Sequence, residues 1–227
     1  AVGLGAVAAL TAVEVGARRL DSRRLALLAT IAAIDAALRM VVVIGVAGFS
    51  PLFFLVLCAG YAVGPQFGFL AGALSLLASA LVTGGVGPWV PYEMFGVAWM
   101  GTAAGLCGLG RRGTPGRRDL AVLAVAGAAL GWLYGALLDI WDWTQYRGDP
   151  GFGWAPGMAP ATALRHYASY YATTSFVWDT FRAAGDVLAV VLLGAPVLLA
   201  LRRFRQRFTV TVLPLPDQCP EPAINSS

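Results

Sequence analysis

The chain has 227 residues, of which 58% are hydrophobic and only 12% are charged, and its mean hydropathy is +0.71. A soluble globular domain carries about 25% charged residues, so this composition excludes an ordinary cytosolic enzyme. All 16 basic residues are arginine, and they are not interleaved with aromatic residues along one helix as in nucleic-acid readers. We therefore expect an all-α, polytopic membrane protein with no nucleic-acid partner.

Apolar runs separated by glycine- and proline-rich turns predict six membrane-spanning helices. In chain order they cover residues 25–46, 51–64, 67–83, 94–110, 120–138 and about 170–201. Six crossings of about 20 residues each use roughly 120 residues, which fits the chain length. The expected organisation is an N-terminal apolar stub with a basic link (1–24), a six-helix membrane domain (25–207) and a proline-containing, disordered cytoplasmic tail (208–227).

Arginine clusters predict the orientation of these spans. Four arginines precede the first span, four lie between the fourth and fifth, and four follow the sixth: Arg18, Arg19, Arg23, Arg24; Arg111, Arg112, Arg117, Arg118; Arg202, Arg203, Arg205, Arg207. An even number of crossings separates each cluster from the next, so all three fall on one side, which the positive-inside rule makes cytoplasmic. The connections at 45–51 and 84–91 and the long loop expected at 141–168 then face outward.

Small residues recur every fourth position at three places in the chain. Such spacing puts them on one helix face, where they let two helices approach closely in lipid. For the two glycine series we expect internal packing, and for the alanine series both packing and docking of another membrane protein stay open. The series are Gly60, Gly64, Gly68 and Gly72; Gly127, Gly131 and Gly135; and Ala29, Ala33 and Ala37.

Ionisable residues inside the spans need a partner or a purpose, since each costs about 2.5 to 3.5 kcal/mol at membrane depth. Asp35 and Arg39 are four apart and are expected to pair on one helix face. Asp179, Arg182 and Asp186 have similar spacing near the outer end of the last span. For these three, an ion pair and a ligand contact both remain open.

Aromatic residues concentrate towards the outer side. Residues 141–178 hold 10 of the 25 Phe, Trp and Tyr residues. An interfacial belt would account well for Tyr170 and Tyr171. Trp141 and its neighbours in the expected loop could instead close over a flat ring system by stacking.

Catalytic and metal-binding signatures are missing from the sequence. His166 has no metal-ligand spacing around it, and no nucleophile turn or phosphate loop is present. The three cysteines have no disulfide or metal spacing. We expect a non-enzymatic protein without a cofactor or metal, so any energised transport would need ATPases on other chains.

Two short motifs stand out in the middle of the chain, GPQFGF at residues 64–69 and GGVGPWVPYEM at residues 84–94. They resemble the GPxFGF turn and the GGVGPWxPxQM segment of the substrate-binding S components of energy-coupling factor (ECF) vitamin transporters, in the branch common in actinobacteria. Tyr134, Gly135 and Trp141 are similar to the end of its fifth helix. Residues 178–182, WDTFR, resemble the WDxxR start of its sixth. The likeness covers most of the chain.

The resemblance implies a six-helix subunit of a prokaryotic plasma membrane that captures a vitamin-like molecule, for example cobalamin or another ring-bearing vitamin, from outside. It would dock on a transmembrane coupling subunit served by two ATPase subunits. The family's AxxxA docking face would fall on Ala29, Ala33 and Ala37. The candidate ligand contacts are Trp89, Tyr92, Glu93, Asp139, Trp141, Trp178, Asp179 and Arg182.

Two departures from the family pattern concern charge. Glu93 stands where the pattern has Gln, and Asp139 and Asp186 stand where Asn is expected. Such residues would suit a more cationic ligand or would be protonated. The rival interpretation is a ligand-free membrane scaffold or assembly protein, in which aromatics form belts and charges form structural pairs.

Overall fold

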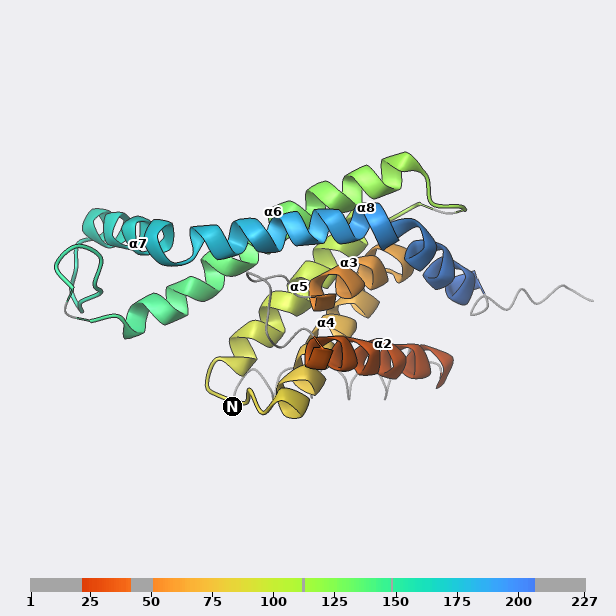
Figure 1. Cartoon of the computed structure of the whole chain (residues 1–227), viewed down its shortest axis with the longest axis horizontal. Helices are drawn as coiled ribbons and strands as arrows, with labels where there is room; N and C mark the ends of the chain where they lie inside the picture. Colours follow the sequence, from red (N-terminus) through yellow and green to blue (C-terminus); the bar gives the residue numbers. More distant parts are fainter. Residues whose placement is uncertain (1–21, 42–50, 112, 148, 207–227) are drawn as a thin grey trace, which may run out of the picture.

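The structure is a computed structural model that describes residues 22–41, 51–111, 113–147 and 149–206. Within these ranges all regular secondary structure is α-helical (Figure 1). The helices are α2 (Ser22–Val41), α3 (Pro51–Val63), α4 (Pro65–Thr83), α5 (Val90–Cys107), α6 (Arg117–Gln145), α7 (Pro160–Thr174) and α8 (Phe176–Gln206). The all-α expectation is confirmed for this part of the chain. The predicted stub at 3–17 and the predicted tail lie outside the described residues.

Three of the helices, α4, α6 and α8, are long and apolar enough to cross a membrane. The chain is therefore consistent with a membrane-embedded helical protein, whereas a six-span bundle is not confirmed. Helix α3 is apolar but has only 13 residues, about 20 Å at 1.5 Å per residue. Helices α6 and α8, with 29 and 31 residues, are about 45 Å long and exceed a hydrocarbon core of about 30 Å.

The 141–168 segment is not the continuous loop that we expected. Helix α6 continues to Gln145, and a further helix, α7, begins with Pro160 in its first turn, where the missing N–H is not needed. The chain then breaks at Ser175, and the last long helix starts at Phe176 rather than near residue 170. Helix α7 packs against α6 and α8 at the end of the molecule far from α2 and α4 (Figure 1).

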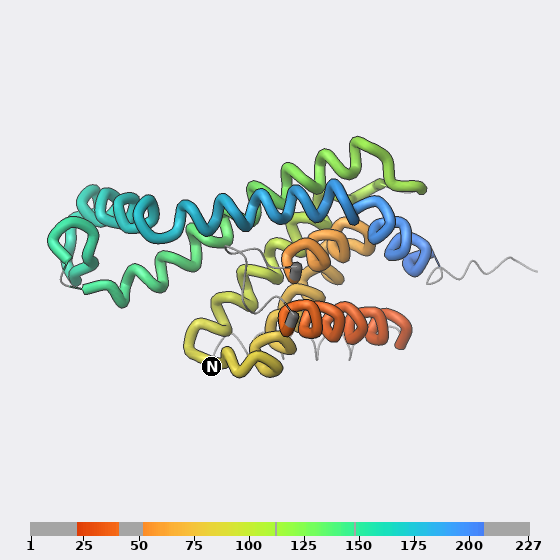
Figure 2. The backbone as a smooth tube through the Cα atoms, viewed as in Figure 1, coloured from red at the N-terminus to blue at the C-terminus, as the bar shows by residue number. Residues whose placement is uncertain are grey.

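The first glycine series packs α3 and α4 tightly against α5. A Cβ added at Gly60 or Gly68 would collide with the backbone carbonyl of Gly101, and one at Gly72 would meet the carbonyl of Val97. The series is interrupted at Gly64, whose φ of +134° makes the turn between α3 and α4. The expectation of internal packing is confirmed, and these three helices form the centre of the bundle (Figure 2).

A buried ionic group around Asp119 joins the start of α6 to the C-terminal part of α8, at the opposite end of these two helices from α7. The Asp119 carboxylate accepts hydrogen bonds from the Tyr61 hydroxyl at 2.8 Å, the Arg202 guanidinium at 3.2 Å and the backbone N–H of Gly116 at 3.0 Å. Arg111 is 3.4 Å from the same carboxylate. Arginines of the second and third clusters thus meet at one end of the molecule, as the charge pattern predicted.

The contacts of Asp119, which lies before the apolar part of α6, keep its carboxyl group ionised. Burial by itself would raise the pKa of Asp119, but hydrogen bonds from Gly116, Tyr61 and Arg202 outweigh burial and lower the pKa to about 2. The guanidinium of Arg202 also bonds the carbonyl of Gly113 and lies over the Tyr61 ring. This end of the protein is therefore closed by a carboxylate whose hydrogen bonds are satisfied, although the Nε atom of Arg202 has no partner.

Candidate functional site

A polar group centred on Arg182 lies between α6 and α8, near α7. The Arg182 guanidinium forms an ion pair with Asp179, one of the two contacts that the spacing left open, and the Tyr171 hydroxyl donates a hydrogen bond of 2.9 Å to the same carboxylate. The guanidinium also lies 5.4 Å from the centre of the Tyr134 ring and 5.6 Å from that of Phe53. Aromatic faces on two sides and a carboxylate on a third hold this cation in place.

The second glycine series makes room for this polar group. A Cβ at Gly135 would overlap the Asp179 carboxylate, and a Cβ at Gly131 would come 3.2 Å from Oδ2 of Asp186. Helix α6 therefore presents a row of glycines to the acidic side chains of α8. The series serves internal packing, as expected, but the groups that pack against Gly131 and Gly135 are carboxyl groups of α8.

Asp186 does not join the ion pair. Its side chain is fully buried, and neither of its carboxylate oxygens has a hydrogen-bond partner. The pairing expected between Asp35 and Arg39 is likewise wrong, since both oxygens of Asp35 also lack a partner. Arg39 instead interacts electrostatically with Glu93 on α5.

Two more carboxyls, from α5 and α6, interact with Arg182. Glu93 and Asp139 are both half-buried and both lie within its electrostatic reach, although neither forms an ion pair with it. Ser175, at the break between α7 and α8, lies beside Asp139, whose Oδ2 atom is buried without a partner. The group thus contains more carboxyls than cations, and some of its hydrogen-bonding capacity is unused.

The predicted aromatic contacts divide into two sets. Tyr92 and Trp141 stack with their ring centres 4.8 Å apart and so join the start of α5 to the end of α6. Trp89 and Trp178 are about half exposed, at 46% and 53%. Of the eight candidate contacts, the structure gathers Tyr92, Glu93, Asp139, Trp141, Asp179 and Arg182 at this end, and leaves the two exposed tryptophans at its margin.

Aromatic residues around α7 pack on each other to form a cap over this end. Tyr170 is only 5% exposed and packs against Tyr146 and Phe152. The indole N–H of Trp143 donates a 2.7 Å hydrogen bond to the carbonyl of Phe152. A belt of lipid-facing rings is therefore the wrong interpretation for Tyr170, whereas Tyr171 is half-buried and donates its hydroxyl hydrogen bond to Asp179.

His166 makes a hydrogen-bond contact within this cap. Its Nδ1 atom is 2.9 Å from the carbonyl oxygen of Gly153, which ties α7 to the connection that precedes it. In the described ranges, no group of three or more His, Cys, Asp and Glu side chains could hold a metal ion. The contact that the structure shows for this histidine is therefore the one between α7 and the preceding connection.

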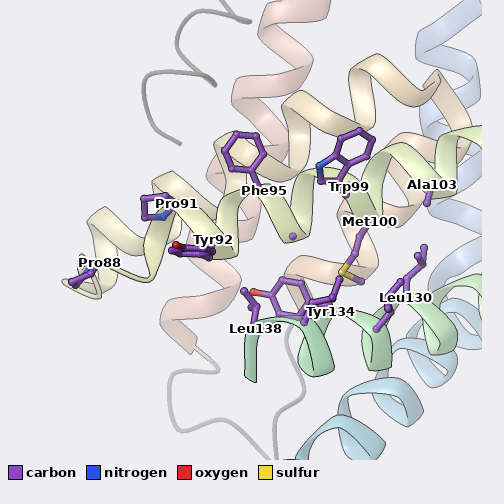
Figure 3. Close-up of a pocket in the computed structure, with 13 residues that line it drawn as sticks. Pro88, Pro91, Tyr92, Phe95, Trp99, Met100, Ala103, Leu130, Tyr134 and Leu138 are labelled. Atoms are coloured by element: carbon purple, nitrogen blue, oxygen red, sulfur yellow. The ribbon is translucent and has the colours of Figure 1, made fainter. Parts of the chain in front are cut away.

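An apolar cavity of about 740 Å³ runs beside the polar group, between α5 and α6 (Figure 3). Tyr92, Phe95, Trp99 and Met100 line it from α5, and Tyr134 faces them from α6 (Figure 3). Tyr134 belongs to both features, because its ring lines the cavity and also lies under the Arg182 guanidinium. A volume of this size suits a drug-sized ligand.

Helix α2 buries one face and exposes the alanine series. Leu28 and Ile31 are buried against the bundle, whereas Ala29, Ala33 and Ala37 are all exposed. A stripe of small side chains on the outer face is open to a helix of another chain. Of the two interpretations left open by the sequence, internal packing of this series is not seen among the described residues.

Sequence reasoning missed several members of the site. Phe53 lies in the apolar start of α3, and its role depends on which helix it meets, so no sequence signal marks it. Ser175 and Tyr171 flank a helix break that we did not predict. The helical spacing pairs Arg39 with Asp35 on the same helix, whereas in the structure the charge of Arg39 acts on Glu93 of α5.

Comparison with known proteins identifies no relative of the chain. The chain matches no protein-family model, no curated protein and no solved structure. The geometry of the chain itself therefore carries the functional argument.

Proposed function

We propose that the chain is the substrate-binding subunit of an ECF-type importer. In this role it would capture a vitamin-like molecule at the α7 end and dock through α2 on a membrane coupling subunit driven by two separate ATPase chains. The proposal rests chiefly on the Arg182 group, in which a caged cation is surrounded by carboxyls from α5, α6 and α8. The motif resemblance and the outward alanine face of α2 support it.

The capture site would use two kinds of contact. Arg182, Asp139 and Glu93 offer charged groups with unused bonding capacity, for example the buried Oδ2 of Asp139 and Nε of Arg182. The neighbouring cavity offers apolar and aromatic walls. Its volume favours a smaller ring-bearing vitamin over a molecule as large as cobalamin, which greatly exceeds drug size.

The docking step would use Ala29, Ala33 and Ala37. Their small side chains allow close approach of a helix of the coupling subunit. We expect Ala33→Trp to abolish co-purification with that subunit while leaving ligand affinity unchanged, because the alanine face points away from the Arg182 group. Ala172→Trp, at an exposed position on α7, is the matched control and should leave co-purification unchanged.

The ligand test begins with protein purified in detergent. We expect mass spectrometry of the denatured sample to release a small molecule, and that molecule to rebind. Arg182→Ala should weaken rebinding at least about 30-fold, since truncating one partner of a buried charge pair costs 2 kcal/mol or more. Arg165→Ala, an exposed arginine on α7, is the matched control and should bind normally.

Two results would contradict ligand capture. One is the absence of any retained molecule together with no micromolar binding across a broad vitamin panel. The other is equal affinity of the Arg182→Ala and Arg165→Ala variants. Arg182→Lys separates binding from folding, because it keeps the charge beside Asp179 but loses the planar guanidinium stacked on Tyr134.

The alternative function is a ligand-free membrane scaffold. The self-packed aromatic cap favours it, because Tyr170, Tyr146 and Phe152 satisfy each other without any ligand. A scaffold would retain no small molecule, and its partners would be assembly proteins instead of ATPases. Co-purification from the native membrane separates the two functions.

A further inference from the structure

A second polar group lies in the seam between α2 and α4, apart from the Arg182 group. Asp35, Ser75 and Ser79 are all 0% exposed. The Ser75 hydroxyl faces the Asp35 carboxyl, and Ser79 follows one turn later on the same face of α4. Nevertheless, both carboxylate oxygens and both hydroxyl oxygens lack a hydrogen-bond partner. Four buried oxygens with unused bonding capacity are therefore found along one helix seam.

No cation of the described chain neutralises Asp35. The ion pairs in the described ranges involve Asp119 and Asp179. Helix α4 has no titratable residue, and α3 contributes only Cys58 and Tyr61, of which Tyr61 is bonded to Asp119. An ionised carboxylate buried in this way without a counter-charge is strongly unfavourable.

Arg39 lies one turn further along α2 but is engaged elsewhere. Its charge acts on Glu93 of α5, and it forms no ion pair or hydrogen bond with Asp35. The Asp35 carboxyl therefore needs a positive charge from outside the described residues. In a membrane protein, a buried acid without such a partner is typical of ion and proton sites.

We propose that Asp35 and Ser75, extended by Ser79, bind a monovalent cation, either a proton or Na⁺. Carboxylate and hydroxyl oxygens are hard ligands, which suit such ions and not soft transition metals. One carboxylate balances one positive charge, so a divalent ion would leave a net charge in a low-dielectric interior. Charge balance thus selects a monovalent ion.

The position of the site links it to α2. Asp35 is on the buried face of this helix, opposite the exposed Ala33 and Ala37. Occupancy would therefore control how firmly α2 is held on α4, and through it the presentation of the alanine face. This regulatory role rests on the proposed docking function, whereas the cation site itself does not.

Thermal unfolding of the full chain in detergent tests the site. In sodium-free choline buffer at pH 8, added NaCl should raise the melting temperature by roughly 3 °C or more, relative to the same concentration of choline chloride. Asp35→Asn, which is nearly isosteric and permanently neutral, should abolish this rise. Ser75→Ala should weaken the apparent Na⁺ affinity roughly tenfold.

A second series distinguishes the proton from Na⁺. In choline buffer, a proton site predicts a higher melting temperature at pH 6 than at pH 8, and a smaller difference in Asp35→Asn. Asp186→Asn is the matched control for the Na⁺ series only, because Asp186 is equally buried and unpartnered, and so responds to pH itself, but lies against α6. It should keep the Na⁺-dependent rise of the wild type.

The proposal is overturned if the wild type responds to neither ion, or if Asp35→Asn keeps the full response. Loss of the response in Asp186→Asn with retention in Asp35→Asn would equally overturn it. None of these measurements requires the transported molecule. A failed cation site and a failed import function are therefore separate results.

Discussion

The two ends of the α6–α8 pair hold buried charge in opposite ways. At one end, Asp119 receives hydrogen bonds from Tyr61, Arg202 and Gly116, which satisfy the carboxylate. At the other, Arg182 satisfies Asp179, but Oδ2 of Asp139 and both oxygens of Asp186 remain without partners. The Arg202 Nε atom also lacks a partner, so the contrast concerns the carboxylate oxygens: those of Asp119 are satisfied, whereas three carboxylate oxygens at the Arg182 end are not, and each such group calls for an explanation.

The contrast extends to the packing around each end. The Asp119 end is closed by the α3–α4 turn, the connection before α6 and the end of α8, with Arg205 bonded to the carbonyl of Ala62. The Arg182 end has a cavity on one side and a cap of aromatic rings on the other. We interpret the first as a fixed anchor and the second as the functional end.

The largest effect is expected at Gly135, where the functional end tolerates no added atom. In Gly135→Ala the new methyl group would overlap the Asp179 carboxylate, which Arg182 and Tyr171 hold in place. We expect a loss of about 3 kcal/mol or more in the free energy of unfolding, seen as a collapse of folded yield in detergent. Gly116→Ala is the control, since its Cβ would meet no atom within 4 Å. Equal yields for the two variants would contradict the glycine–carboxylate packing.

The next effect tests the anchor with two neighbouring arginines. Arg202→Ala removes a buried partner of Asp119 and should lower the free energy of unfolding by about 2 to 3 kcal/mol. Arg203→Ala removes the same charge from an exposed position and should cost no more than about 0.5 kcal/mol. Thermal unfolding of the two variants measures the difference, and similar melting temperatures would show that the anchor is not stabilising.

A dependence on pH should follow from Asp119 as well. Because its pKa in the fold, about 2, lies below the ordinary 3.8, the ionised form stabilises the protein at neutral pH. That contribution is lost as the pH falls from about 4 towards 2. We expect the gap in melting temperature between the wild type and Asp119→Asn to narrow between pH 6 and pH 3. A gap that stays constant over this range would contradict the ionic role of Asp119.

The smallest effect concerns the aromatic contact at the functional end. Tyr92→Ala removes the stack on Trp141, a contact worth about 0.5 to 1.5 kcal/mol, and should lower the melting temperature slightly. Val177→Ala, at a similarly exposed site on α8, should change it less. If Tyr92→Ala is as stable as Val177→Ala, the stack does not hold α5 to α6.

Part of this site could be read from the sequence because the pattern is local. Asp179 and Arg182 are three residues apart on one helix, so their pairing needs no knowledge of other elements. The same rule failed for Asp35 and Arg39, because the bundle turns Asp35 inward to Ser75 and brings Glu93 of α5 near Arg39. Spacing along a helix shows which residues share a face, but not what that face meets.

The aromatic-rich segment gives a similar lesson. Its composition correctly drew attention to residues 141–178, but the sequence alone favoured a loop and a lipid-facing belt. In the structure Pro160 starts α7, and Tyr170 turns inward onto Tyr146 and Phe152. Aromatic content does not distinguish a belt from a packed cap, because both remove ring surface from water.

The sequence by itself determined the helical class, the apolar lengths of α4, α6 and α8, and the grouping of arginines at chain positions that meet at one end. These properties follow from composition and from periodicity along single helices. Only the tertiary structure decided that Gly135 faces Asp179, that the alanine series faces outward and that Asp35 has no counter-charge among the described residues. Each of these depends on which helix lies opposite, and contacts between distant segments are not encoded in any local pattern.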